Sequence, residues 1–207
     1  MTKETHHLRM YLMRHGEIDA THRQFAYGSR DINLSTTGEE QSHWMCQQLS
    51  GVKLDAVYSS DLKRASFASN LIARHHHLAV IHLPQLREVH MGEWENQPIA
   101  DIYEKYPKHV KHLFQEPESF QYPQGEHFLA FKDRVLSTLK VIIATHQTGS
   151  VAVVAHGGVT RLVIAHVLEI PPRHMLRIGQ DFGCLNVIDW YQDGPILRLL
   201  NQVKPGE

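Results

Sequence analysis

Two histidines stand in matching surroundings in this chain, each after a short apolar run and directly before glycine. They are found in Arg14-His15-Gly16, after the run 8–13, and in His156-Gly157-Gly158, after the run 150–155. A short apolar run closed by glycine is typical of a buried strand. Because glycine allows the backbone to approach a ligand closely, each histidine is expected at a strand tip that faces a binding site.

Arginines and a helix start accompany these histidines, and both favour a bound anion. Arg14 precedes His15, and Arg64 follows a second apolar strand pattern. The planar guanidinium fork matches phosphate oxygens better than the point charge of lysine does. A helix is expected directly after Gly157 and Gly158, so that its unpaired N–H groups and positive dipole end face the same place. Each residue alone has a structural explanation, but together they predict a phosphate site.

The elements that must position these residues alternate between strand and helix patterns. Strands are predicted at 8–13, 55–58, 78–83 and 150–155, helices at 35–49, 126–145 and 157–168, and a closing hairpin at 185–191 and 196–200. A further helix is expected after Ser60-Asp61, which we interpret as its N-cap. This alternation predicts an open α/β sheet with helices on both faces. Ligands of such sheets bind beyond the carboxyl ends of the strands, where both histidines are expected.

One segment, 93–125, departs from this alternation. It contains four prolines and several aromatic residues, with short helical stretches between the prolines. Proline-interrupted segments of this kind are typical of excursions from a core rather than of the core itself. We therefore predict a single domain over residues 1–207 with a lid-like excursion at about 93–125.

Size and composition indicate an ordinary globular protein. The chain has 207 residues, of which 42% are hydrophobic and 21% charged, and its formal net charge is −1. The absence of a basic excess argues against nucleic-acid or anionic-membrane partners. Neither a membrane-spanning run nor a secretory signal is visible, and Cys46 and Cys184 are too few and too far apart for a disulfide framework. We expect a cytoplasmic protein and leave open whether it is a monomer or a homodimer.

The 17 histidines raise the question of a metal site. Three of them are consecutive, His75-His76-His77. Consecutive residues on a helix or strand cannot all face one ion, and no zinc-type ligand spacing accompanies them. We interpret this cluster as a solvated helix end and expect no metal and no other cofactor.

Several motifs, in order along the chain, resemble the signatures of the histidine phosphatase (phosphoglycerate mutase-like) superfamily. They are LMRHGE at 12–17, LSTTG at 34–38, SSDLKRA at 59–65, LREVHMGEWE at 86–95 and VAHGG at 154–158. The resemblance implies a mainly parallel sheet flanked by helices. It also implies that His15 is the phosphorylated nucleophile, that Arg14, Arg64 and His156 clamp the phosphate, and that Glu88 donates a proton.

Within the family, the chain is most similar to the α-ribazole-5′-phosphate phosphatases of cobalamin synthesis. The segments that carry this likeness are 125–131, 183–189 and 197–201. There are departures, because Thr21 stands where the family commonly has asparagine, and Ile18 stands where it has threonine or serine. The resemblance places substrate contacts at Thr21, Tyr27 and Gly28, and a phosphate-binding amide is expected at Gly157.

These assignments predict hydrolysis of a small phosphate monoester in two steps without a metal. His15 attacks as neutral imidazole, which two nearby arginines favour by disfavouring its protonation. A phosphohistidine forms, and Glu88 protonates the leaving group. Glu88 then takes a proton from the water that releases phosphate.

Two other functions are weighed against this one. A phosphoglycerate mutase or a broad-specificity sugar phosphatase would use the same machinery, but a mutase must also hold a carboxylate. No arginine lies between Arg87 and Arg134, and the aromatic residues there suit a neutral, nucleoside-like leaving group better. A non-catalytic phospho-ligand-binding module is disfavoured because all the core residues are present.

Overall fold

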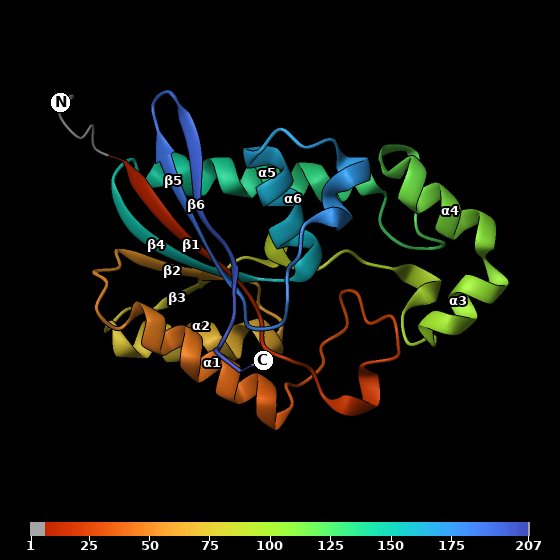
Figure 1. Ribbon diagram of the computed structural model, residues 1–207, viewed down its shortest axis with the longest axis horizontal. Helices are drawn as coiled ribbons and strands as arrows, with labels where there is room; N and C mark the ends of the chain where they lie inside the picture. The colour runs from red at the N-terminus through yellow and green to blue at the C-terminus, as the bar shows by residue number, and fades with distance from the viewer. Residues whose placement is uncertain (1–6, 207) are drawn as a thin grey trace.

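The computed structural model describes residues 7–206 and is built around a six-stranded sheet with the strand order β3-β2-β4-β1-β5-β6 (Figure 1). The strands are β1 Leu8–Arg14, β2 Ala56–Ser59, β3 Val80–His82, β4 Gly149–Ala155, β5 Leu185–Tyr191 and β6 Gly194–Gln202. The four strands β3, β2, β4 and β1 are parallel to their neighbours, while β5 and β6 add an antiparallel edge. The prediction of a mainly parallel α/β sheet is confirmed.

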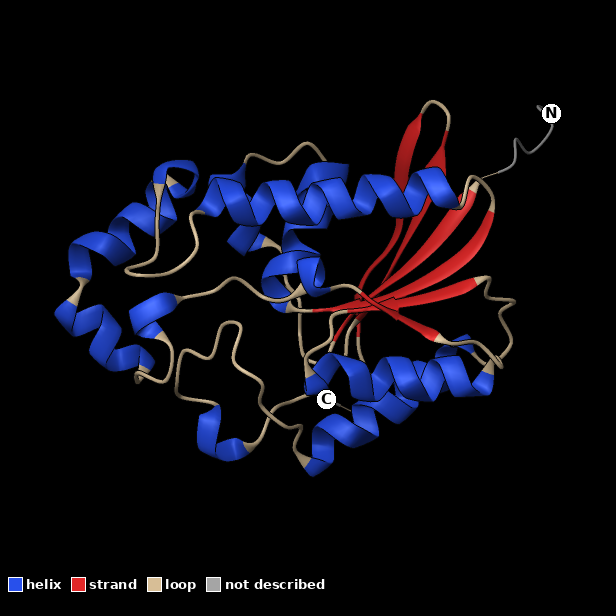
Figure 2. Cartoon of the chain, turned by 180° about the vertical axis from the view of Figure 1, so that it is seen from behind, coloured by secondary structure: helices blue, strands red, loops and turns tan. Residues whose placement is uncertain are grey.

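Helices cover both faces of the sheet (Figure 2). α1 Thr36–Leu49 and α2 Lys63–His75 pack on one face, and α5 Phe128–Thr145 and α6 Gly157–Val167 on the other. From Val151 onward every residue of β4 is buried, as expected of a central parallel strand that is covered on both sides. The tips of β1 and β4 lie at the carboxyl ends of the parallel strands, between the two helical layers, where ligands of such sheets bind.

The excursion contains α3 Ile99–Lys105 and α4 Pro107–Gln115, which lie beyond the end of the sheet (Figure 1). Short 3-10 helices occur there at Gly92–Trp94 and Pro117–Ser119, and elsewhere at Ala20–His22, Pro84–Leu86 and Pro172–Arg177. Phe120 contacts the rings of Trp94 and Tyr122, with centroids 5.8 and 5.0 Å away. All three rings belong to the hydrophobic core that also contains the buried side chains of α5 and α6. The excursion is thus anchored by aromatic packing rather than loosely attached.

The largest differences between predicted and observed element boundaries concern β3, β6 and α2, while other boundaries shift by one or two residues. β3 has three residues instead of six, and β6 extends to nine, which shortens the hairpin loop. α2 begins after Leu62, which makes no side-chain cap, so the predicted Ser60-Asp61 cap is wrong. The Ser60 hydroxyl instead lies 2.8 Å from Nε2 of His156. Residues 1–6, where we expect no secretory signal, lie outside the described residues.

The described part of the chain bears on two questions, a membrane span and a metal site. Within residues 7–206, no helix combines the length and the apolar character that a membrane span requires. Over the same residues, no three His, Cys, Asp or Glu side chains gather closely enough to hold a metal ion. His75 ends α2 and is exposed, as is His77, in agreement with a solvated helix end.

Candidate active site

The tips of β1 and β4 bring the two predicted histidines together. Arg14 and Ala155 are partners in the parallel ladder, and the backbone N–H of His15 donates to the carbonyl of Ala155 at 3.1 Å. Their side chains follow at the same level, so the rings of His15 and His156 lie 5.1 Å apart in an edge arrangement. Both rings are almost completely buried. Two residues separated by 141 positions therefore share one buried site.

Contacts of the His15 ring define which nitrogen is available for attack. Nδ1 lies 2.7 Å from the carbonyl oxygen of Gly16, which can only accept, so Nδ1 carries the proton. Nε2 accepts from Nε of Arg64 at 3.2 Å and holds the lone pair. Burial, followed by the positive charges of Arg64 and Arg14, holds the pKa of His15 well below its ordinary value. His15 is therefore a neutral imidazole with its lone pair directed into the site.

Arg64 is buried and is held by backbone carbonyls rather than by a carboxylate. Its Nη2 donates to the carbonyl of Gly28 at 2.8 Å, and its Nη1 donates to that of Arg30. The guanidinium also lies 5.2 Å from the centre of the Tyr27 ring. Since these partners carry no formal charge, the arginine keeps its attraction for an anion.

Arg14 is fixed from three sides but retains an open donor. Nη1 donates to the carbonyl of Gln180 at 2.5 Å, Nη2 to the Tyr27 hydroxyl at 3.4 Å, and the guanidinium stacks 3.8 Å above Phe182. Nε of Arg14 and Nδ1 of His156 are buried without a hydrogen-bond partner in the described part of the chain. Buried donors are almost always satisfied, so this pair indicates where a ligand oxygen would bind.

The hydroxyl of Ser60 contacts the ring of His156. This hydroxyl accepts from the backbone N–H of Leu62 at 3.3 Å and lies 2.8 Å from Nε2 of His156. The hydroxyl hydrogen can point at Nε2, and in this arrangement the ring proton resides on Nδ1. Burial and the charge of Arg64 hold the pKa of His156 well below its ordinary value. His156 thus presents a neutral N–H to the site.

Glu88 reaches the same site from the loop between two 3-10 helices. Its Oε2 accepts from the backbone N–H of Gly158 at 2.8 Å, in the first turn of α6, and its Oε1 accepts from Val89 at 3.0 Å. A Cβ at position 158 would overlap Oε1 of Glu88. Glycine at 158 is therefore what allows the carboxylate to approach the helix N-terminus.

A cavity of about 360 Å³ extends from these groups toward the excursion. Arg14, Glu88 and Gly157 are among its lining residues. Tyr27 and Gly28, both predicted substrate contacts, also line it. Thr21, the third, does not line it: its side chain is exposed and donates to Oδ1 of Asp19 at 2.7 Å. The rest of the cavity is mainly apolar and aromatic, with lining residues that include Phe25, Trp94, Ile102, Tyr103, Phe114, Phe128, Phe131 and Met175.

Two arginines at this cavity were not anticipated from the sequence. Arg161 lies one helical turn after Gly157 on α6, and its Nε donates to the carbonyl of Ile178 at 2.9 Å. Burial and the neighbouring charge of Arg14 lower its pKa. Arg173 lines the cavity from the 3-10 helix that follows α6. The spacing of four from Gly157 to Arg161 was the available signal, because residues four apart share a helix face.

Fold and site together define a phosphate-handling protein of the α/β class, with two neutral histidines, buried arginines and a carboxylate around one anion position. A family model for the histidine phosphatase superfamily (branch 1) matches residues 10–203, and the chain belongs to this superfamily.

Relatives support the same class. Adenosylcobalamin/alpha-ribazole phosphatase of Escherichia coli (strain K12) is 30% identical, with 94% of this chain and 96% of the relative covered. Phosphoserine phosphatase 1 of Hydrogenobacter thermophilus is 27% identical, with 94% and 92% covered. A crystal structure of a putative alpha-ribazole-5′-P phosphatase from E. coli K-12 superposes with a TM-score of 0.85 at 30% identity, over 94% of this chain and 96% of the other. This chain is a phosphatase.

Proposed function

We propose that the protein hydrolyses a phosphate monoester with a neutral, aromatic leaving group, of which α-ribazole 5′-phosphate is the best example, through a phosphohistidine at His15. The observation that carries the proposal is the mainly apolar, aromatic cavity that opens directly from the anion position. Binding sites of this kind bury the apolar part of a small ligand and orient it with few polar groups. The name of the E. coli relative supports the same substrate.

In the first step the phosphate occupies the space beside the open donors of Arg14 and His156. Arg64 shifts its Nε–H from His15 to a phosphate oxygen, which frees the Nε2 lone pair. Nε2 attacks phosphorus, and the bond from phosphorus to the ester oxygen breaks with its electron pair on that oxygen. Glu88 supplies the proton that makes the leaving group a neutral alcohol. Arginine and N–H donors stabilise the charge on the non-bridging oxygens throughout.

The second step returns the enzyme to its starting state. Glu88, now ionised, accepts a proton from water as the water oxygen attacks phosphorus. The P–N bond breaks with its electron pair on Nε2 of His15, and inorganic phosphate leaves. The hydrogen bond from Nδ1 to Gly16 keeps one tautomer of His15 through both steps.

A second candidate substrate carries a carboxylate, and Arg161 with Arg173 favours it. Both line the cavity. Their guanidinium forks match a carboxylate as well as a phosphate. Phosphoserine and phosphoglycerate are compounds of this kind, and a relative named as a phosphoserine phosphatase has the same extent along the chain. The segment 93–125, which we propose as a lid over the cavity, contributes no arginine to such a site.

A substrate panel distinguishes these candidates. Steady-state kcat/KM is measured for α-ribazole 5′-phosphate, phosphoserine, 3-phosphoglycerate and ribose 5-phosphate. The proposal expects the first to exceed the others by at least about 10-fold, since a 10-fold ratio corresponds to about 1.4 kcal/mol, which the burial of about 60 Å² of additional apolar surface supplies. A preference for phosphoserine would transfer the assignment to the second candidate.

The covalent step has its own test. Rapid quenching with ³²P-labelled substrate is expected to trap an acid-labile, base-stable phosphoenzyme. His15→Ala abolishes it, whereas His156→Ala still forms it slowly, with a loss on the order of 10²-fold. Label retained in His15→Ala, or found on another residue, would overturn the assignment of the nucleophile.

A further inference from the structure

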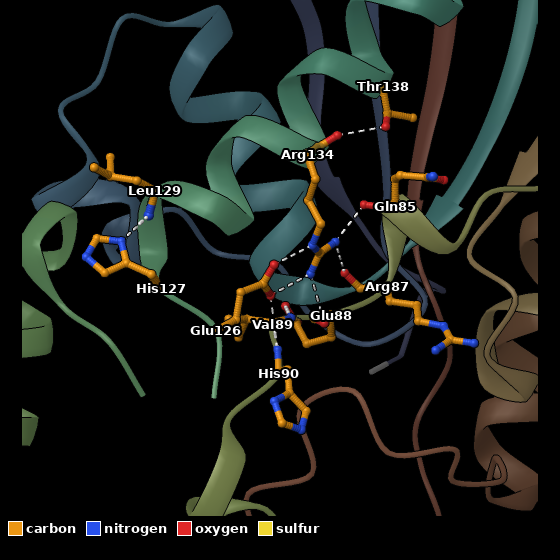
Figure 3. Close-up of polar contacts among 10 residues, drawn as sticks. All are labelled: Gln85, Arg87, Glu88, Val89, His90, Glu126, His127, Leu129, Arg134 and Thr138. Atoms are coloured by element: carbon orange, nitrogen blue, oxygen red, sulfur yellow. Dashed lines mark hydrogen bonds and ion pairs between the residues drawn. The ribbon is translucent and has the colours of Figure 1, made fainter. Parts of the chain in front are cut away.

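The segment 125–131 and Arg134 have no role in the two steps above, yet both lie against the loop that carries Glu88. Figure 3 shows Arg134, on α5, among the backbone groups of residues 85–90. Nη1 donates to the carbonyls of Gln85 and Arg87, at 2.6 and 2.8 Å, and Nη2 donates to the carbonyl of Glu88 at 3.2 Å. One guanidinium therefore holds three carbonyls of a loop that belongs to no strand or α-helix.

Glu126, two residues before the start of α5, completes this contact. Its Oε1 accepts from Nε of Arg134 at 2.6 Å, and its Oε2 accepts from Nη2 at 2.9 Å. Oε2 also accepts from the backbone N–H of His90 at 3.2 Å, and the backbone N–H of Glu126 donates to the carbonyl of His90. All five N–H donors of Arg134 are thereby used. The loop is held at both ends, at Gln85 and at His90.

The geometry determines where the Glu88 side chain can lie. Its carbonyl is bound by Arg134 on one side of the backbone, and its carboxylate is bound by the Gly158 amide on the other. The pair is largely buried, with side-chain exposures of 23% for Arg134 and 16% for Glu126, and the guanidinium rests 4.9 Å from the ring centre of Phe131. Bidentate arginine–carboxylate pairs fix orientation as well as distance. A rigid frame of this kind is what a proton donor requires, because a displacement of about 1 Å can reduce a rate by about 10²-fold.

We infer that Arg134 and Glu126 are positioning residues for Glu88, which set the distance from its carboxyl group to the leaving oxygen. This inference rests on the proposed role of Glu88 as the leaving-group acid. It predicts a defect that depends on the leaving group. An alkoxide or phenolate needs the proton, whereas p-nitrophenolate is stable without it.

Two matched substrates isolate this defect, phenyl phosphate and p-nitrophenyl phosphate, since their rings fill the cavity alike. The rate of phosphoenzyme formation is measured in the first, pre-steady-state phase for Arg134→Met, Arg134→Lys and Glu126→Gln. Arg134→Met is expected to lose about 10- to 10²-fold on phenyl phosphate and less than about 3-fold on p-nitrophenyl phosphate. Arg134→Lys keeps the charge without the fork, so its selectivity is expected to follow Arg134→Met. Glu126→Gln, which keeps one acceptor, is expected to lose about 3- to 10-fold on phenyl phosphate.

Two reference variants separate the possible failures. Lys132→Met, on the same helix as Arg134, removes the ion pair from Lys132 to Glu118 of the 3-10 helix Pro117–Ser119 and is expected to leave the ratio of the two rates unchanged. Glu88→Gln is expected to show the largest selective loss, about 10²- to 10⁴-fold on phenyl phosphate.

The pattern of losses decides between the two claims. Equal losses on both substrates for the Arg134 and Glu126 variants, beside a selective loss for Glu88→Gln, overturn the positioning role and leave the proposed function intact. No selectivity in Glu88→Gln overturns the acid assignment itself. If Arg134→Met does not fold, as shown by circular dichroism, Arg134→Lys and Glu126→Gln decide the question.

Discussion

Acidification from pH 7.5 to 5.5 is expected to destabilise the folded protein through the two buried histidines of the site. Burial and the nearby arginine charges hold the pKa of His15 and of His156 well below their ordinary value of about 6.5. In the unfolded chain both recover that ordinary value. Below pH 6.5 the unfolded state therefore binds more protons than the folded state, and the free energy of unfolding falls as the pH falls.

The size of the effect follows from the linkage relation. A histidine that stays neutral when folded contributes RT ln(1 + 10^(6.5 − pH)) to the loss, which is on the order of 1 kcal/mol at pH 5.5 and close to zero at pH 7.5. His15 and His156 together reach roughly 2 to 3 kcal/mol at pH 5.5. A typical free energy of unfolding is about 5 to 15 kcal/mol, so this loss is readily measured.

Urea unfolding at several pH values tests this prediction. Phosphate is left out of the buffer, because a bound anion would stabilise the folded state by mass action. His15→Asn and His156→Asn are each expected to reduce the stability difference between pH 7.5 and 5.5 by on the order of 1 kcal/mol, and the double variant by about twice that. His75→Asn is the control, since His75 is exposed at the end of α2. A wild-type pH dependence in the double variant would refute the neutral state of both rings, and with it attack by a free lone pair of His15.

Three further outcomes are expected. Ser60→Ala removes the hydroxyl that contacts the ring of His156, and we expect kcat to fall about 3- to 10-fold, as for the loss of one hydrogen bond. Gly158→Ala places a Cβ against Oε1 of Glu88, so pre-steady-state kinetics are expected to show a larger loss on phenyl phosphate than on p-nitrophenyl phosphate. Activity is expected to persist in excess EDTA, because neither step calls on a metal, and a loss of activity that one divalent ion restores would contradict the mechanism.

The parts of the site that could be predicted from sequence are those encoded locally. An apolar run that ends in His-Gly indicates both a strand and its functional tip, so the sequence alone predicts that His15 and His156 lie at one edge of the sheet. The fold class followed from the same alternation of strands and helices. Boundaries were less accurate where tertiary contacts intervene: Ser60 has the chemistry of a helix cap, but its hydroxyl is engaged by His156, 96 residues away.

Contacts between side chains and distant backbone carbonyls could not be predicted from the sequence, for a physical reason. Arg134 donates to carbonyls 46 to 49 residues earlier, and carbonyls are present at every position. No pattern of side chains in the sequence therefore indicates such a contact. Gln180 binds Arg14 in the same way, through its main chain. By contrast, Arg161 lies four residues after Gly157, and its place at the cavity could have been inferred from helical spacing alone.

The structure also separates the groups that handle phosphate from those that meet the leaving group. Arg64 has no exposed surface and bonds to two carbonyls, so replacing it would leave buried acceptors unsatisfied at a cost of about 1 to 3 kcal/mol each. Tyr103, Phe114 and Leu176 also line the cavity, yet 45–53% of each is exposed. Exposed side chains of this kind can be exchanged within about 0.5 kcal/mol of stability. The phosphate position is thus constrained by folding itself, while the mouth of the cavity is free to vary, which explains how relatives at 27–30% identity can share this fold under names that specify different substrates.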